Sequence, residues 1–220
     1  MNALPLLGLG LLLGLRHAMD PDHVVAVAAI TARTRRILPA TWLGMVWGMG
    51  HTLTLFTVGA AIILFNLVVP ARLGLGFELA VALALVVVGL LNLRPSAAGS
   101  ATVSPEVAAP LPALRAFVVG LVHGLAGSAA VALLVLATVR DPWWACGYLA
   151  VFGIGTLIGM AIITTGIASP LVLAGRHWSG SGHPIRVFTG VLSLAFGVWL
   201  IYQIGWLDGL FRAVPHWDPH

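Results

Sequence analysis

Long apolar segments alternate with short polar ones along the whole chain. Six segments are predominantly apolar: residues 4–33, 38–69, 76–93, 111–139, 143–173 and 185–207. Several exceed the ~20 residues that an α-helix needs to cross a hydrocarbon core of ~30 Å, so we expect tilted, kinked or broken helices. The pattern predicts an all-α polytopic membrane protein with about six transmembrane helices.

The composition supports this class. Charged residues make up 8% of the 220 residues and hydrophobic residues 60%, whereas soluble domains carry roughly 25% charged residues. All basic residues are arginines, and in a membrane protein their excess sets the topology, so we expect lipid and not nucleic acid as a partner. The single cysteine, Cys146, excludes an internal disulfide. The N-terminal apolar stretch lacks a basic region before it, so we expect no cleavable signal peptide.

The arginines predict an orientation and a multi-pass location in the cytoplasmic (inner) membrane. If the segment after residue 33 is cytoplasmic, the cytoplasmic side holds seven arginines, and both termini lie outside. These seven are Arg33, Arg35, Arg36, Arg94, Arg115, Arg176 and Arg186, against Arg72, Arg140 and Arg212 on the other side.

The two halves of the chain resemble each other. His123 follows His17 by 106 positions in similar surroundings, and Phe152 follows Trp47 by 105. Because each half has three spans, the second half must run inverted, which is a common design of secondary transporters with a site near the midplane. We therefore expect discontinuous helices at the midplane and four regions: a first three-helix repeat (1–93), a flexible linker rich in Ala, Ser and Pro (94–112), a second repeat (113–207) and a C-terminal tail (208–220).

The segment RHAMDPDH, residues 16–23, interrupts the first apolar segment with charged residues and a proline. Pro21 has no backbone N–H and clashes with the preceding turn, so we expect two half-helices instead of one. Asp20 is the predicted N-cap of the second half-helix, and Arg16 would form an ion pair with it if that turn stays helical. Arg16 and Pro21 therefore have predicted structural roles. The same pair, Asp141-Pro142, is expected to open the fifth apolar segment.

Histidine and carboxylate side chains at mid-membrane favour a site for a divalent first-row metal ion, because imidazole suits Ni, Co, Zn and Cu(II). The predicted ligands are His17, Asp20, Asp22, His23 and His51. His123, Ser128 and Thr156 are predicted to line the substrate pathway. The alternative for His123 is to hold a second broken helix, and residues like Ser128 and Thr156 more often pack between helices than bind a ligand. The small residues around His123, including Gly120 and Gly124, predict either close helix packing or a second helix break.

The spacing H-x-x-x-x-D-H, formed by His17, Asp22 and His23, resembles the signature of the nickel/cobalt transporter (NiCoT) family. Residues 50–56, GHTLTLF, resemble its second motif, and GLVHGLAGSAA in the second half looks more like the shorter UreH-like branch. The resemblance implies a nickel or cobalt permease whose signature helix carries substrate ligands. The second half lacks the acidic motifs of that family.

We expect a secondary transporter for Ni²⁺ or Co²⁺ that works by alternating access and is not an enzyme. The transported ion is its cargo, and no prosthetic group is expected. Open alternatives are a metal exporter of the same superfamily, a non-transporting accessory protein that delivers metal, and an intramembrane metalloenzyme, against which the absence of H-E-x-x-H counts. A second copy of the chain and a metallochaperone are the expected protein partners.

Overall fold

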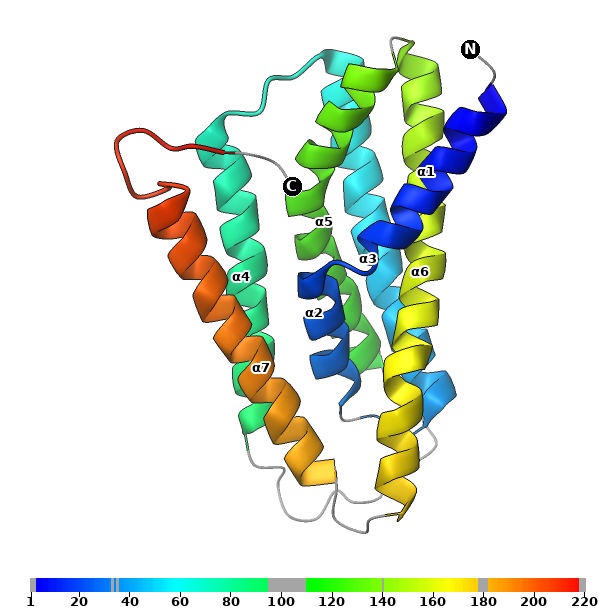
Figure 1. Ribbon diagram of the computed structural model, residues 1–220, viewed down its shortest axis with the longest axis vertical. Coiled ribbons are helices and arrows are strands. Elements are labelled where there is room, and N and C mark those ends of the chain that lie inside the picture. Colours follow the sequence, from blue (N-terminus) through cyan, green and yellow to red (C-terminus); the bar gives the residue numbers. More distant parts are fainter. Residues whose placement is uncertain are drawn as a thin grey trace.

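The chain folds into a bundle of helices (Figure 1). The computed structural model describes residues 3–32, 34, 36–94, 110–139, 141–177 and 182–217, and within them it contains no strand. The helices are α1 (Ala3–His17), α2 (Pro21–Thr31), α3 (Ile37–Phe65), α4 (Ala71–Leu93), α5 (Pro110–Thr138), α6 (Pro142–His177), α7 (Gly182–Tyr202) and a π-helical turn, η1 (Gln203–Leu207). The predicted all-α class is confirmed for the described residues.

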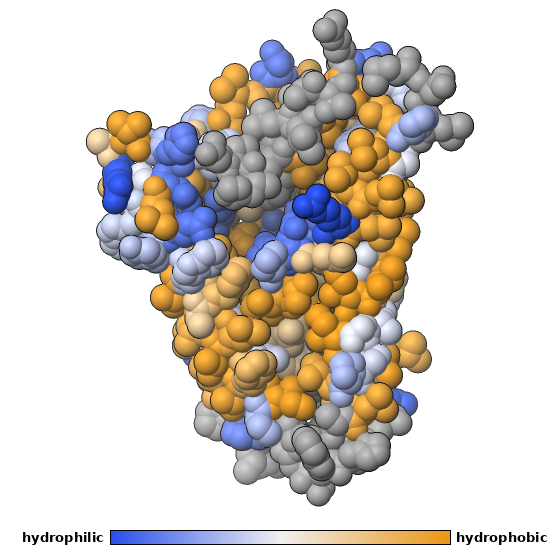
Figure 2. Space-filling view, viewed as in Figure 1, coloured by the Kyte–Doolittle hydropathy of each residue, from blue (hydrophilic) through white to orange (hydrophobic). Residues whose placement is uncertain are grey.

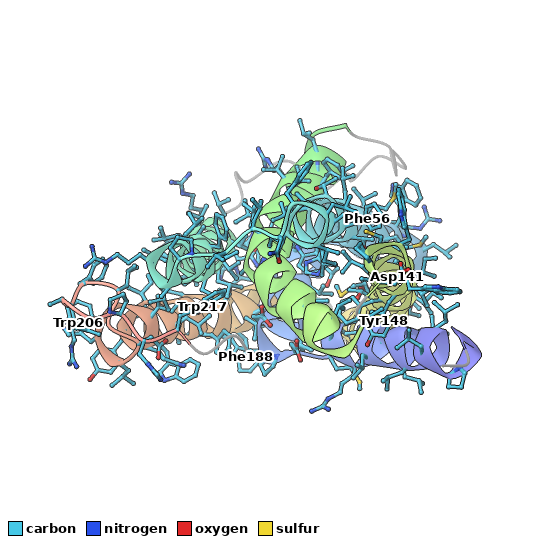
Figure 3. The ribbon with its side chains drawn as sticks, turned by 90° about the horizontal axis from the view of Figure 1, so that it is seen from above. Phe56, Asp141, Tyr148, Phe188, Trp206 and Trp217 are labelled. Atoms are coloured by element: carbon cyan, nitrogen blue, oxygen red, sulfur yellow. The ribbon has the colours of Figure 1, made fainter. Side chains whose placement is uncertain are left out.

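Helix α3 lies at the centre of one group of helices. It packs along α5 and α6, and α1 packs along the outer side of α6, while α4 and α7 form a second pair. Seen from above, α5 runs between the two groups (Figure 3). Half-helix α2 contacts α3, α4, α6 and α7, whereas Arg16, Met19 and Pro21 at the break before it are exposed.

The outer surface is apolar over most of the height of the bundle (Figure 2). Large hydrophobic side chains point outward, among them Leu12, Phe188 and Trp143 at 63%, 68% and 79% exposure. Within the described part of the chain, four helical stretches are long and apolar enough to cross a membrane: Ile37–Phe65, Ala71–Leu93, Pro142–Leu173 and His183–Leu207. A surface of this kind fits a lipid environment, because lipid chains would cover apolar side chains that are costly to expose to water.

The first apolar segment is divided, as the sequence predicts. The chain leaves α1 through two tight turns, in which the Met19 and Asp20 amides bond to the carbonyls of Arg16 and His17 at 2.8 and 3.1 Å. Pro21 then begins α2 at a position where its missing N–H costs nothing. At 15 and 11 residues, α1 and α2 are each too short to cross a membrane alone.

The second half has no corresponding break. Helix α5 runs without interruption from Pro110 to Thr138, because Gly120 and Gly124 only weaken a helix, whereas a proline removes a hydrogen bond and clashes. Of the two predicted roles for these glycines, close packing is the one observed. A Cβ atom at Gly120 would overlap the Trp47 carbonyl oxygen, and one at Gly124 the His51 carbonyl oxygen.

The two ends of the bundle differ in their arginines. Helices α2, α4 and α6 end where α3, α5 and α7 begin (Figure 1), and Arg36, Arg94, Arg115, Arg176 and Arg186 lie on helices at or next to that end. Arg72 and Arg212 lie at the opposite end, where an Arg72 Nη2 atom donates to the Ala213 carbonyl at 3.4 Å. The predicted partition of these arginines between the two ends is therefore confirmed, whereas Arg33, Arg35 and Arg140 lie outside the described residues.

Replacing Gly14 by alanine should destabilise the protein, whereas replacing Gly8 on the same helix should not. A Cβ at Gly14 would overlap the Phe152 carbonyl oxygen, while one at Gly8 has no neighbour within 4 Å. Overpacking of this kind costs about 1–3 kcal/mol, and Gly8→Ala gains up to about 1 kcal/mol of helix propensity. Thermal unfolding in detergent measures both, and equal melting temperatures for the two variants would contradict the packing of α1 against α6.

Candidate metal centre

Three histidines meet at the helix break. His17 ends α1, His23 lies in the first turn of α2, and His51 lies in the middle of α3. One ring nitrogen from each lies within 4.8 Å of one from each of the others. The structure thus brings together three residues that the sequence predicts as ligands, from segments up to 34 positions apart.

The pair His17 and His51 has the spacing of two ligands on one ion. Their Nε2 atoms are 3.3 Å apart, a contact in which one ring donates a proton to the other. A zinc–imidazole bond is about 2.0–2.1 Å long, so two nitrogens on one tetrahedral ion lie about 3.3 Å apart. An ion could replace the shared proton with little movement of either ring.

Two carboxylates orient these rings. Asp20 Oδ2 lies 2.7 Å from His17 Nδ1, and Asp22 Oδ1 lies 2.9 Å from His23 Nδ1. A carboxylate that accepts from Nδ1–H fixes the tautomer and leaves Nε2 as a free electron pair, which is the usual second-layer arrangement around metal-bound histidine. In these contacts the two aspartates orient the rings, and Asp22 keeps its second oxygen for another partner. One carboxylate oxygen each of Asp20 and Asp22 also lies within 4.8 Å of a ring nitrogen of His23, so their predicted role as direct ligands stays a prediction.

Asp20 also departs from its predicted role as a helix cap. It occupies the N-cap position of α2, but its side chain makes no capping hydrogen bond. At the matching Asp-Pro pair, Asp141 Oδ1 accepts from the amides of Trp143 and Trp144 at 2.9 and 3.2 Å, as predicted. The difference is the neighbouring imidazole of His17, which holds the Asp20 carboxylate away from the helix.

The predicted ion pair between Arg16 and Asp20 is not formed. Arg16 has an exposed side chain at the end of α1. The tight turns after His17 end the helix before Asp20, so the i, i+4 geometry that would join the two side chains is lost. Pro21 keeps its predicted structural role.

A fourth histidine closes the cluster. His123 on α5 is 2% exposed, and its Nε2 lies 3.6 Å from Asp22 Oδ2. The ring of His23 contacts the rings of His17, His51 and His123, with centroid separations of 4.6, 5.0 and 5.4 Å. The first and second halves of the chain therefore meet at His23.

Sequence reasoning missed Trp47. This residue is fully buried one turn before His51 on α3, with its indole stacked on the His51 ring at 5.4 Å and edge-on to His23 and His123 at 5.2 and 5.1 Å. The available signal was the i, i+4 spacing from His51, which places both side chains on one helix face. Trp47 keeps water from that side of the cluster.

Several buried nitrogens of the cluster have no hydrogen-bond partner among the described residues. They are His23 Nε2, His51 Nδ1, both ring nitrogens of His123 and Trp47 Nε1. Buried polar atoms are almost always paired, because an unpaired one costs about 1–3 kcal/mol. Imidazole nitrogens without a hydrogen-bond partner, next to carboxylates that have one, are suitable ligands for a cation.

The remaining predicted pathway residues are not part of this cluster as described. Thr156 is fully buried, and its hydroxyl donates to the Phe152 carbonyl at 3.0 Å within α6. Phe152 in turn contacts His17, with ring centroids 5.4 Å apart. Ser128 lies on α5, but its side chain is outside the described part of the chain. Whether any of these residues binds an ion stays a prediction.

An apolar helical bundle with a histidine–carboxylate cluster at a broken helix defines a helical membrane protein with a candidate metal centre. The chain is 34% identical, over 221 aligned residues and 96% of both chains, to the urease accessory protein UreH of Bacillus sp. (strain TB-90). At this identity and coverage, the chain belongs to the UreH family. No family model matches the sequence, and no solved structure matches the chain.

Substituting Asp20 by asparagine should lower metal affinity, because the carboxylate that orients His17 is lost. Loss of such a partner typically costs about 10–100-fold in affinity. Asp141→Asn changes the same kind of Asp-Pro helix start far from the cluster and should leave affinity unchanged. Equilibrium titration of the purified protein with Ni²⁺ or Co²⁺ against a competing chelating dye measures both. If Asp20→Asn binds the metal with the affinity of the wild-type protein, the Asp20 carboxylate does not contribute to metal binding.

Proposed function

We propose that this protein is a secondary transporter of divalent transition-metal cations, with Ni²⁺ as the first candidate cargo and Co²⁺ as the second. The observation that carries the proposal is the convergence of ring nitrogens from His17, His23 and His51 within 4.8 Å, at a break in a helix inside an apolar bundle. Irregular backbone at membrane depth is tolerated where it lines a path for a polar substrate. Ionisable residues at such a position mark a substrate pathway.

The ligand atoms at the cluster favour nickel or cobalt as the cargo. Three imidazoles without a thiolate suit nickel, cobalt and zinc better than Cu(I), and too few oxygens are present for Mg²⁺ or Ca²⁺. The name of the relative, a urease accessory protein, supports nickel among these, since urease is a nickel enzyme. The resemblance of the H-x-x-x-x-D-H motif to nickel/cobalt transporters points the same way.

The charge of the cluster fits a divalent ion. Asp20 and Asp22 together carry two negative charges next to the three imidazoles, so a bound divalent cation would be neutralised inside the bundle. Imidazole binds a metal only in its neutral form, so binding competes with protons. A proton gradient or the membrane potential is therefore the proposed driving force, and the chain has no lysine with which to build a nucleotide-binding loop.

Two related, inverted halves would provide alternating access. A Cβ at Gly14 would overlap the Phe152 carbonyl, and a Cβ at Gly120 would overlap the Trp47 carbonyl. Gly120 follows Gly14 by 106 positions and Phe152 follows Trp47 by 105, so the two contacts are equivalent under exchange of the halves.

A second pair of contacts repeats this relation. A Cβ at Gly50 would overlap the Phe117 carbonyl, and one at Gly155 would overlap the Leu11 carbonyl. Helix α3 packs along α5 as α6 packs along α1, and α4 pairs with α7. Exchanging the halves maps each contact onto another, which supports the proposed repeat.

The orientation is proposed from the arginines. The end that holds Arg36, Arg94, Arg115 and Arg186 would face the cytoplasm of a cell whose inner membrane the protein crosses several times. Transport inward is the proposed direction, and export by the same path is its alternative. The relative's role as a urease accessory protein favours a second candidate function, in which the protein holds metal and passes it to a metallochaperone or other accessory protein.

Metal flux into proteoliposomes tests the proposal. Wild-type protein should carry Ni²⁺ and Co²⁺ to an enclosed metal-sensing dye, with Zn²⁺ and Mn²⁺ as comparisons. His17→Ala removes a ligand and should reduce the flux by about tenfold or more. His216→Ala, on the exposed C-terminal segment, is the matched control and should transport normally.

Each outcome has a distinct meaning. Flux that is absent for every metal, or that is unchanged in His17→Ala, would refute transport through this cluster. Tight binding by the purified protein without flux would favour the delivery role. Turnover of a hydrolysable substrate that depends on bound metal would instead favour the enzyme alternative.

A further inference from the structure

His123 is a buried histidine that the first cation position does not use. Its side chain is 0% exposed, and neither ring nitrogen makes a hydrogen bond of good geometry among the described residues, although the Val119 backbone one turn earlier interacts with the ring. Burying an imidazole without a partner is costly. The cost is recovered if a ligand occupies the space next to the ring.

The Asp22 carboxylate faces this ring. Its Oδ1 atom binds His23 Nδ1 at 2.9 Å, and its Oδ2 atom lies 3.6 Å from His123 Nε2. A separation of 3.6 Å is too long for a hydrogen bond. It is close to the ~3.4 Å that separates an oxygen and a nitrogen ligand on one tetrahedral first-row ion.

His23 separates this space from the first position. Among the described residues, the His23 ring contacts those of His17, His51 and His123, while His123 contacts His23 and Trp47 but not His17. The exposed fraction of the side chains falls from the carboxylates to the rings. Asp20 and Asp22 are 46% and 29% exposed and His17 16%, whereas His123 is 0%.

We propose that Asp22 and His123 form a second, inner cation position next to the one at His17, His23 and His51, with His23 as a ligand common to both. This inference rests on the proposed transport function and adds a path to it. The ion enters at the side of His17 and keeps its bond to His23. It then exchanges the nitrogens of His17 and His51 for Asp22 Oδ2 and His123 Nε2. No bond within the protein is made or broken, and the metal keeps its charge.

The inner position joins the two halves of the chain. Asp22 and His23 belong to α2, and His123 belongs to α5. His123 also corresponds to His17 in the proposed repeat, so each half would supply one histidine of this matched pair to one of the two cation positions. A relative movement of the halves would change the inner position more than the outer one, because His17, His23 and His51 all come from the first half.

Comparing equilibrium binding with flux tests the inner position. His123→Ala should change the Kd for Co²⁺ in detergent by less than about threefold, because the outer position is intact. The same variant should lose about tenfold or more of the flux in proteoliposomes. His51→Ala should lose both, and His216→Ala, the exposed-histidine control, should lose neither.

A cysteine at position 123 tests direct ligation. In a Cys146→Ala background, His123→Cys should give Co²⁺-loaded protein a thiolate-to-cobalt charge-transfer band in the near-ultraviolet. The band should weaken when Asp22→Asn is added. Because a purely structural role for His123 predicts no such band, this second variant keeps the test decisive even if His123→Ala does not fold as a monodisperse protein.

Three results would overturn the proposal. They are wild-type flux in His123→Ala, a Co²⁺ affinity that falls in His123→Ala as far as in His51→Ala, and a cobalt spectrum of His123→Cys without the thiolate band. Each of these leaves wild-type flux, and therefore the proposed function, in place. Failure of the wild-type protein to carry any metal would refute the proposed function instead.

Discussion

The structure depends on one interruption of backbone hydrogen bonding partway along an apolar bundle. Pro21 prevents α1 and α2 from joining, so the chain around His17 and Asp20 turns through irregular backbone that is exposed at Met19 and Pro21 and carries buried rings beside it at His23 and His51. Helix α6 packs against α1 and α2, α3 packs against α2 and α6, and α5 packs along α3. They approach closely because glycines meet backbone carbonyls there, as Gly120 meets the Trp47 carbonyl.

The same interruption arranges the chemistry. An unbroken helix would place His17 and His23 on different faces, since six residues are about one and two-thirds turns. The break instead brings their rings to a centroid separation of 4.6 Å and places each beside a carboxylate. The cluster thus combines oriented nitrogen donors with compensating negative charge, and the burial of the His23 and His51 rings strengthens both effects.

Hydrophobic patterning predicted the helical segments and the break, because both follow from local rules: segment length, the missing N–H of Pro21, and capping by Asp141. It also predicted the meeting of His17, His23 and His51. It did not predict that Asp20 would bind His17 rather than cap α2, since that choice depends on a tertiary arrangement in which the imidazole lies 2.7 Å away. The isolation of Arg16, the continuity of α5 and the position of Trp47 likewise depend on packing between helices.

The direction of the peptide dipoles at the break has a consequence for how long a cation would stay. Helix α1 ends beside the cluster with its carbonyl end, which attracts positive charge, while α2 begins there with its amide end, which repels it. The Asp20 side chain does not cap α2, but the Asp22 carboxylate lies in its first turn and offsets this repulsion. The backbone thus draws a cation toward α1, and at α2 it weakens the hold of the Asp22 carboxylate on the ion. A carrier gains from this opposition, because an ion held too firmly would end the cycle.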